Sequence, residues 1–131
     1  MKLLLDTHIW IWSLLDPARL GRGIKRRLED GANELWISPI SLWETMLLVE
    51  RGRIELDQPP SDWIDRQLIR VPLRDAPLTR AVAVKSRELT LIHEDPADRF
   101  LAATAAVYEL TLVTADMRLW GGAGYQVLRS R

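Results

Sequence analysis

Short apolar runs alternate along the chain with longer segments in which apolar residues recur at helical spacing. The first run, Leu3-Leu-Leu5, is uninterrupted, which is typical of a strand buried on both faces in a parallel sheet. Similar runs predict four further strands, at residues 34–37, 67–73, 111–114 and 125–128. Pro72 restricts the third of these to a sheet edge, because proline cannot donate a sheet hydrogen bond.

Helical periodicity separates these runs. The helix predicted at residues 39–51 is the clearest, because Ser38-Pro39 supplies an N-cap followed by proline at the first helical position, and Gly52 ends the segment. Further helices are predicted at residues 8–15, 19–30, 76–89 and 96–109, with a shorter helical segment after Pro59-Pro60-Ser61 that contains Trp63 and Ile64. Strands that alternate with helices predict an α/β fold with a mainly parallel sheet of about five strands. The length fits a single domain, residues 1–131.

The composition excludes several kinds of site. The chain has no cysteine, so it cannot form a disulfide framework, a thiolate-bound zinc site or an iron–sulfur cluster. Lysine plus arginine and aspartate plus glutamate number 18 each, so net charge says nothing about a polyanionic partner. The apolar stretches are too short for a signal-peptide core or a bilayer span, and we therefore expect a cytoplasmic protein with no membrane association.

Two aspartates stand at the ends of predicted strands. Asp6 terminates the first apolar run, and Asp116 follows Leu112-Val-Thr-Ala115. Ligands bind at the carboxyl ends of parallel strands, so these two carboxylates meet in one crevice if their strands are neighbours. The alternative for Asp6 is a purely structural role as the N-cap of the next helix.

Glu44 interrupts the apolar face of a predicted helix. It shares that face with Ile40 and Leu48. Burial of a lone carboxylate is unfavourable unless a partner or a metal ion compensates. The alternative is a capping box, in which Ser41 is the N-cap and Glu44 reaches back to a backbone amide, although Ser38 offers a better helix start one turn earlier.

Asp98 is a second acid on an apolar helix face, together with Leu101. The alternative is again structural: Asp95 as N-cap, Pro96 as the first helical residue and Asp98 as the third, where an acid favours the helix dipole. This alternative does not compete with a site for Asp98, because a carboxylate near a helix start can also hold a cation.

Several oxygen ligands without cysteine, and with only two histidines, point to a hard divalent ion such as Mg²⁺ or Mn²⁺. Three or four clustered carboxylates cannot all stay ionised without a cation. The chemistry that needs this arrangement is phosphodiester hydrolysis, in which metal ions activate a water molecule and neutralise the phosphate. A dinucleotide-binding fold is disfavoured, because no Gly-x-Gly-x-x-Gly turn follows the first strand.

The motifs resemble those of the PIN-domain ribonucleases, and within them the VapC-like toxins of bacterial toxin–antitoxin pairs. The resemblance covers nearly the whole chain, through Leu3-Leu-Leu-Asp-Thr-His8, Ser38-Pro-Ile-Ser-Leu-Trp-Glu44, Arg51-Gly52, His93-Glu-Asp-Pro-Ala-Asp-Arg99, Leu101-Ala-Ala103 and Leu112-Val-Thr-Ala-Asp116. It implies a PIN-like three-layer α/β/α sandwich. It also implies that the catalytic, metal-binding acids are Asp6, Glu44, Asp98 and Asp116, and that accessory positions are Thr7, Asp95 and Thr114.

The resemblance also implies a function. The expected activity is Mg²⁺- or Mn²⁺-dependent cleavage of structured RNA such as tRNA or ribosomal RNA, by attack of a metal-activated water on a phosphodiester. The expected partners are a second copy in a homodimer and a VapB-like antitoxin, with a larger toxin–antitoxin assembly as a further option. Leu48 stands where many relatives of this subgroup carry lysine, and Ala97 where a bulky aromatic is usual. Leu48 keeps open the alternative of a catalytically weak or inactive interaction module.

Other polar residues near these motifs have less specific roles. Arg99 is interpreted as a structural ion-pair partner in preference to a phosphate ligand. His8 and His93 are interpreted as structural or hydrogen-bonding residues in preference to general acids. Basic residues with two equally supported roles, contact with the RNA backbone or solvation, are those of the helix that begins near Arg19 together with Arg51, Arg53 and Arg118.

The chain contains six tryptophans, most of which we expect to be packed in the core. Trp10 and Trp12 lie on either side of Ile11, so they cannot share one helix face. We therefore expect at least one of the two at the surface, where a protein interface is a reasonable use for it.

Overall fold

The computed structural model describes residues 1–91 and 94–130. Parallel strands form one five-stranded sheet in the order β3-β2-β1-β4-β5. Their bounds are β1 (Lys2–Leu5), β2 (Glu34–Ile37), β3 (Arg74–Asp75), β4 (Thr111–Thr114) and β5 (Gln126–Arg129). The α/β fold with a parallel sheet of five strands, expected from the sequence, is confirmed.

The central strand is β1. Strands β2 and β3 follow on one side of it, and β4 and β5 on the other, so the order of the strands reverses at β1. Strand β1 pairs with β2 on one side and with β4 on the other, where Leu5 lies opposite Val113. The strand ends that precede Asp6 and Asp116 are therefore neighbours, as a shared crevice requires.

Six α-helices and two short 3-10 helices connect the strands in the described residues. Their bounds are α1 (Thr7–Leu15), η1 (Pro17–Arg19), α2 (Arg22–Glu29), α3 (Pro39–Glu50), α4 (Pro60–Arg70), α5 (Arg80–Glu88), α6 (Pro96–Tyr108) and η2 (Met117–Leu119). The helices predicted at residues 19–30 and 76–89 begin later than expected. In the first case η1 precedes the regular helix, and in the second the N-cap is Thr79. Among the described residues, no helix has both the length and the apolarity that a bilayer crossing requires.

The strand predicted at residues 67–73 is wrong, because its first four residues belong to α4. Trp63 and Gln67, one helical turn apart, are both buried, whereas Ile69 is 79% exposed. The helical burial pattern thus outweighs the β-branched residues that suggested a strand. The edge strand does exist, but it is the two-residue β3, which begins just after Pro72.

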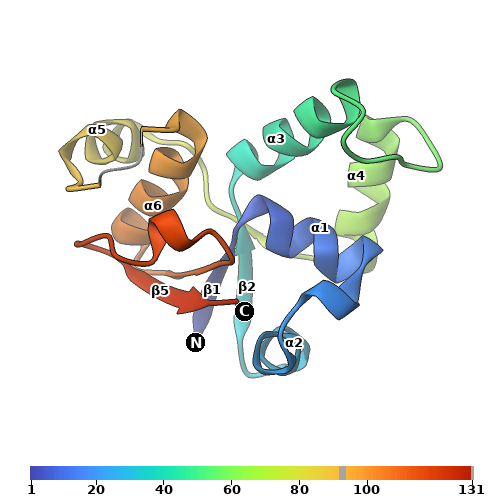
Figure 1. Ribbon diagram of the computed structural model, residues 1–131, viewed down its shortest axis with the longest axis horizontal. Coiled ribbons are helices and arrows are strands. Elements are labelled where there is room, and N and C mark those ends of the chain that lie inside the picture. Colours follow the sequence, from blue (N-terminus) through green and yellow to red (C-terminus); the bar gives the residue numbers. More distant parts are fainter. Residues whose placement is uncertain (92–93, 131) are drawn as a thin grey trace.

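Alternate residues of β1 face opposite helical layers, which produces an α/β/α sandwich (Figure 1). Leu3 and Leu5 pack in a cluster with α1, α2 and α4, on the right in Figure 1, whereas Leu4 packs with α6 on the other side. The outer helix α5 packs on α6. All three leucines are buried, so the uninterrupted apolar run correctly predicted a strand covered on both faces.

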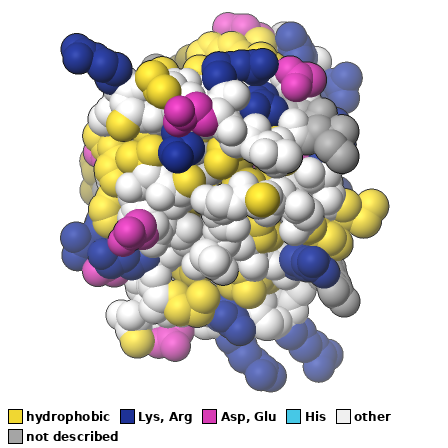
Figure 2. Space-filling view, turned by 90° about the vertical axis from the view of Figure 1, so that its left-hand side faces the viewer, with side chains coloured by type: hydrophobic (Ala, Val, Ile, Leu, Met, Phe, Trp, Pro, Cys, Tyr) yellow, Lys and Arg dark blue, Asp and Glu magenta, His cyan; other side chains and the backbone are white. Residues whose placement is uncertain are grey.

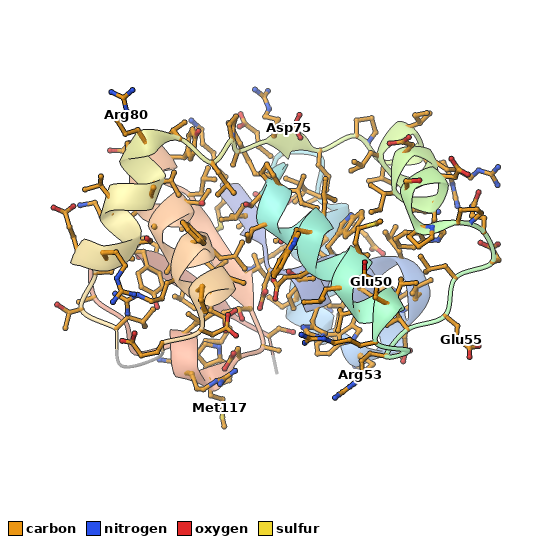
Figure 3. All side chains as sticks on the ribbon, turned by 90° about the horizontal axis from the view of Figure 1, so that it is seen from above. Glu50, Arg53, Glu55, Asp75, Arg80 and Met117 are labelled. Carbon is orange, nitrogen blue, oxygen red and sulfur yellow. The ribbon has the colours of Figure 1, made fainter. Side chains whose placement is uncertain are left out.

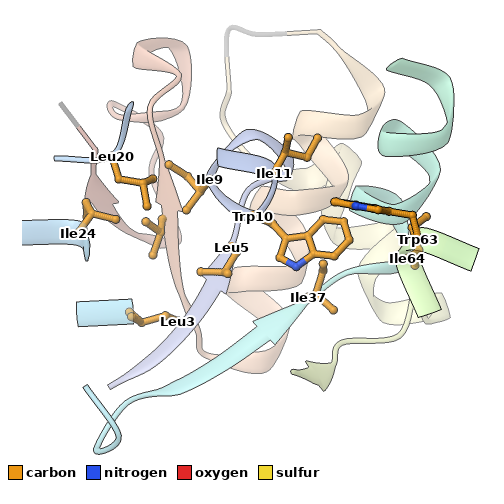
Figure 4. Packing of buried hydrophobic residues seen from close by; sticks show 11 residues of the cluster. Leu3, Leu5, Ile9, Trp10, Ile11, Leu20, Ile24, Ile37, Trp63 and Ile64 are labelled. Atoms are coloured by element: carbon orange, nitrogen blue, oxygen red, sulfur yellow. The ribbon is translucent and has the colours of Figure 1, made fainter. Parts of the chain in front are cut away.

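Trp10 and Trp63 anchor the larger core cluster (Figure 4). Each is 3% exposed, and their ring centroids are 5.7 Å apart in an edge-to-face arrangement. This pair joins α1 to α4 beside Leu5 and Ile37. The expected core role is confirmed for Trp10, and the contact fixes the direction in which α1 leaves the end of β1.

Helix α3 lies above the carboxyl ends of the strands (Figure 1). Ser38 begins it as predicted: its hydroxyl accepts a 3.1 Å hydrogen bond from the Ile40 amide, and Pro39 follows as the first helical residue. α3 contacts α1 and α6, and in the view from above it runs beside α6 (Figure 3). The start of α1, α3 and the start of α6 therefore surround one end of the sheet.

Candidate active site

A cavity of about 420 Å³ opens at the carboxyl ends of β1 and β4. Its lining includes all four acids that the sequence singled out, which are Asp6, Glu44, Asp98 and Asp116, and we call it the acid cavity. The other lining residues are His8, Trp12, Asp95, Ala115 and Arg118. Four separate segments of the chain contribute to this wall, so only the tertiary structure brings the acids together.

Asp6 serves both as a helix cap and as a wall of the cavity. Its Oδ1 accepts a 2.7 Å hydrogen bond from the Thr7 amide at the start of α1, and its Oδ2 accepts a 2.6 Å hydrogen bond from the Thr114 hydroxyl. Burial raises the pKa of Asp6 to about 6; the Thr114 hydrogen bond opposes this rise, and the charge of Asp98 adds to it. The cap role that the sequence offered for Asp6 is therefore confirmed, and it leaves the carboxylate in the lining of the cavity.

Glu44 projects from α3 into the same cavity. Its Oε1 accepts a 2.5 Å hydrogen bond from the hydroxyl of Thr7, so the residue after Asp6 orients the second acid. Burial raises the pKa of Glu44 to about 7; the Thr7 hydrogen bond lowers it, and the negative charges of Asp6 and Asp98 raise it further. The capping-box alternative for Ser41 is wrong, because Ser38 is the N-cap of α3.

Asp95 and Asp98 occupy the start of α6. Asp95 is the N-cap, as the structural alternative proposed, and its Oδ1 accepts a 3.2 Å hydrogen bond from the Asp98 amide. Asp98 is 9% exposed and lines the cavity. The cap fixes the first turn of α6 and, with it, the direction in which the Asp98 carboxylate points.

Asp116 follows β4 and caps η2. Its Oδ1 accepts 3.0 Å hydrogen bonds from the amide and the Nε of Arg118, and its Oδ2 lies 2.9 Å from an Arg118 guanidinium nitrogen. The same guanidinium lies 3.9 Å from Asp98 Oδ2. Asp116 raises the pKa of Arg118, which stays charged. The sequence left contact with RNA and solvation as equal alternatives for Arg118; in the structure its exposed side chain lines the acid cavity and pairs with Asp116.

The arrangement is rich in oxygen donors and poor in positive charge. Among the residues that the structure describes, no three aspartate, glutamate or histidine side chains could hold a metal ion as they are placed. Asp6 and Glu44 nevertheless carry raised pKa values in a wall shared with Asp98, which is the electrostatic condition that a cation relieves. The carboxylate oxygens of this cavity are therefore suited to bind a hard cation such as a divalent metal ion.

The remaining candidates differ in how close they lie to the cavity. Arg99 is buried and donates to three backbone carbonyls, those of Ser86, Leu89 and Leu91, so its structural interpretation is confirmed. His93 lies outside the described residues. The basic residue Arg51 lines a neighbouring groove between α3 and α6, not the acid cavity.

Two lining residues, His8 and Trp12, were not predicted as part of a site. They lie on α1, four residues apart, directly after Asp6. Residues four apart share one face of a helix, and this helix begins at the residue after Asp6. The spacing of His8 and Trp12 could therefore have predicted from the sequence that both lie near Asp6.

Comparison with known proteins finds a matching family, a relative in sequence and solved structures with a similar fold. Residues 3–120 match the family described as PIN domain. Ribonuclease VapC22 of Mycobacterium tuberculosis is 36% identical over 117 residues, which cover 88% of each chain. The solved VapBC2 structure from Rickettsia felis, bound to a promoter DNA fragment, has a TM-score of 0.75 at 19% identity over 100% of both chains. DNA-bound VapBC from Salmonella typhimurium has a TM-score of 0.69 at 18% identity over 98% of both chains. These structural likenesses concern the fold.

Proposed function

Because this chain belongs to the PIN-domain family, we propose that it is a divalent-metal-dependent endoribonuclease toxin that cleaves structured RNA such as tRNA or ribosomal RNA. One observation carries the proposal: the acids Asp6, Glu44, Asp98 and Asp116 line a single cavity at the strand ends. Similarity to a ribonuclease over most of the chain supports RNA as the substrate.

The donor set fits Mg²⁺ or Mn²⁺. All four acids offer carboxylate oxygens, which hard divalent ions prefer, and the chain has no thiol that would favour a softer metal. The four carboxylates would hold the ion, directly or through water molecules. When bound, the ion would supply an activated water and neutralise the charge of the phosphate.

The residues around the acids have distinct tasks in this scheme. Asp6 is held rigidly, because the Thr7 amide and the Thr114 hydroxyl each bind one of its oxygens. Thr7 also orients Glu44 through its hydroxyl. Arg118 brings a guanidinium to the rim of the cavity, where it can meet an RNA phosphate.

Water is the proposed nucleophile. Among the described residues that line the cavity, none is a serine, threonine or cysteine that could attack phosphorus itself. The two buried threonines beside it, Thr7 and Thr114, both donate their hydroxyl hydrogens to carboxylates. The side chains therefore position the reactants, and the attacking oxygen comes from solvent.

The deciding experiment is cleavage of tRNA and ribosomal RNA by the purified protein, with EDTA, Mg²⁺ or Mn²⁺. We expect cleavage only with a divalent ion, and a loss of at least about a hundredfold in Asp6→Asn and Asp98→Asn, which keep the size of each side chain. Asp75→Asn is the matched control, because Asp75 is exposed on β3, at the edge of the molecule in Figure 3. Equal activity in all three variants would refute the proposal.

We also propose a homodimer that is neutralised by a VapB-like antitoxin. The related structures include VapBC complexes and a toxin–antitoxin complex from Klebsiella pneumoniae. A groove of about 690 Å³ between α3 and α6 supports a protein interface, because it is lined by apolar residues such as Trp43, 55% exposed, and Leu78, 42% exposed.

Light scattering tests the dimer. We expect the mass of two chains for the wild type and of one chain for Trp43→Glu. Ile69→Glu is the control, because Ile69 is an exposed residue of α4. Co-purification with the product of a small neighbouring gene tests the antitoxin. Absence of cleavage in every form, together with tight binding of that product, would favour an interaction module over an enzyme.

A further inference from the structure

A stack of three side chains, His8, Trp12 and Arg19, runs outward from the acid cavity. The rings of His8 and Trp12 have centroids 5.7 Å apart, with their planes inclined by 51°. The guanidinium carbon of Arg19 lies 4.5 Å from the centroid of the Trp12 ring. His8 and Trp12 line the cavity, whereas Arg19 lies beyond it in η1. The stack therefore connects the cavity to the start of basic helix α2.

Trp12 differs from its neighbour Trp10 in its surroundings. Trp10 is 3% exposed and packs on Trp63, whereas Trp12 is only half-buried. Arg19 covers one face of the Trp12 ring, and the indole also lines the cavity. Part of the indole is therefore open to a ligand that enters beside the acids.

Arg19 is exposed, and its side chain forms no ion pair or hydrogen bond with any residue in the described part of the chain. The ring holds the guanidinium in place while its N–H groups stay free. This is unlike Arg74, which also lies over a tryptophan, Trp36, but is paired with Glu34. On the side of the molecule where α5 lies, at the left of Figure 1, positive and negative side chains are interspersed (Figure 2).

We propose that Trp12 and Arg19 form a subsite for an unpaired nucleotide next to the scissile phosphate, with its base against the Trp12 ring and its phosphate at the Arg19 guanidinium. The inference rests on the proposed ribonuclease function. An aromatic ring beside a free arginine is the combination that binds single-stranded RNA, because the ring stacks on a base and the guanidinium contacts the backbone. A base in a duplex is already stacked and cannot bind in this way.

Binding in EDTA tests the subsite without any cleavage. The probe is a fluorescein-labelled, single-stranded RNA of about twelve nucleotides and mixed sequence, and its Kd is measured over a range of salt concentrations from about 50 to 300 mM. We expect Trp12→Leu to weaken binding about tenfold without changing the slope of log Kd against log salt. Arg19→Ala should weaken binding and lower that slope by about 0.7, the value expected when one phosphate is no longer neutralised by the protein.

Three variants separate binding from folding. Trp12→Phe keeps an aromatic ring and should restore most of the affinity, and Arg19→Lys should restore the salt slope. Arg74→Ala removes an arginine that lies on another tryptophan away from the cavity, and should change neither quantity. Thermal unfolding of each variant shows whether a change in affinity follows a change in stability.

The outcomes distinguish this inference from the proposed function. If the wild type binds and cleaves RNA but Trp12→Leu binds with about the same affinity, or Arg19→Ala keeps the full salt slope, the subsite is refuted alone. If both variants bind RNA normally but no longer bind the antitoxin, the stack is a protein-binding surface and the subsite is again refuted. If the wild type neither binds nor cleaves RNA, the ribonuclease proposal and the subsite both fail.

Discussion

The hydroxyl of Thr114 donates a 2.6 Å hydrogen bond to Asp6 Oδ2, which joins two residues 108 positions apart in the sequence. The same hydroxyl accepts a 3.0 Å hydrogen bond from the Asp116 amide. One side chain at the end of β4 thus links the acid that follows β1 to the acid that follows β4. Because the hydrogen bond favours the ionised form of Asp6, Thr114 opposes the rise in pKa that burial causes.

Thr114→Val should therefore raise the pKa of Asp6 above about 6. Valine keeps the shape of the side chain but removes the donor. We expect the acidic limb of the pH–rate profile for RNA cleavage to move to higher pH, with the largest loss of activity, about three- to tenfold, below about pH 7. Thr111→Val, at the other end of β4, is the control. An unchanged profile would show that the hydrogen bond does not govern the ionisation of the site.

Glu44→Gln should stabilise the metal-free protein increasingly as pH rises. The folded protein raises the pKa of Glu44 from 4.5 to about 7, so between these values it binds more protons than the unfolded chain. Glu44 thus favours the folded state most below about pH 4.5, and this contribution disappears as pH rises through 7. Glutamine does not titrate, so the melting temperature of the variant should rise by a few degrees relative to the wild type between about pH 5 and pH 8 in EDTA.

Glu50→Gln is the control for that measurement, because Glu50 lies on the same helix but is exposed (Figure 3). Its melting temperature should follow that of the wild type over this pH range. The same behaviour in Glu44→Gln would mean that burial does not disfavour the Glu44 carboxylate.

Leu48→Lys should increase activity near neutral pH. Leu48 lies one helical turn after Glu44, and both line the groove between α3 and α6. A lysine four residues after a glutamate can pair with it, which lowers the pKa of Glu44 and increases its ionised fraction. We expect cleavage to rise about two- to fivefold at about pH 6.5 and little at about pH 8. Leu48→Gln, similar in length but uncharged, should not reproduce this increase, and an equal increase in both variants would rule out the electrostatic explanation.

Arg99→Lys should destabilise the fold by about 2–4 kcal/mol, because lysine cannot reach all three carbonyls that the guanidinium binds and leaves buried acceptors unpaired. These carbonyls lie in and after α5, so the substitution should loosen α5 from α6. Urea unfolding measures the change, and Arg80→Lys is the control, because Arg80 is an exposed residue at the start of α5. A variant of normal stability that no longer cleaves RNA would instead place Arg99 in contact with the substrate.

Local sequence patterns were sufficient for much of the fold. The run Leu3-Leu-Leu5 identified β1 and its burial on both faces, because a buried parallel strand needs apolar residues on both sides. Ser38 and Pro39 located the start of α3 to the residue, because capping depends only on the adjacent backbone. The segment from 67 to 73 failed, because its periodicity is ambiguous over so short a length, and packing of Trp63 and Gln67 decided for helix.

By itself, the sequence determined the order of strands and helices and the four acids that interrupt apolar patterns, since these depend on residues close together in the chain. It also indicated the family, since short motifs keep their order and spacing along the chain. Only the tertiary structure decided what those acids contact. Thr114 binds Asp6, Thr7 orients Glu44, and Arg118 pairs with Asp116 and approaches Asp98. These relationships depend on which strand ends and helix starts become neighbours, and the packing of the whole chain sets that arrangement.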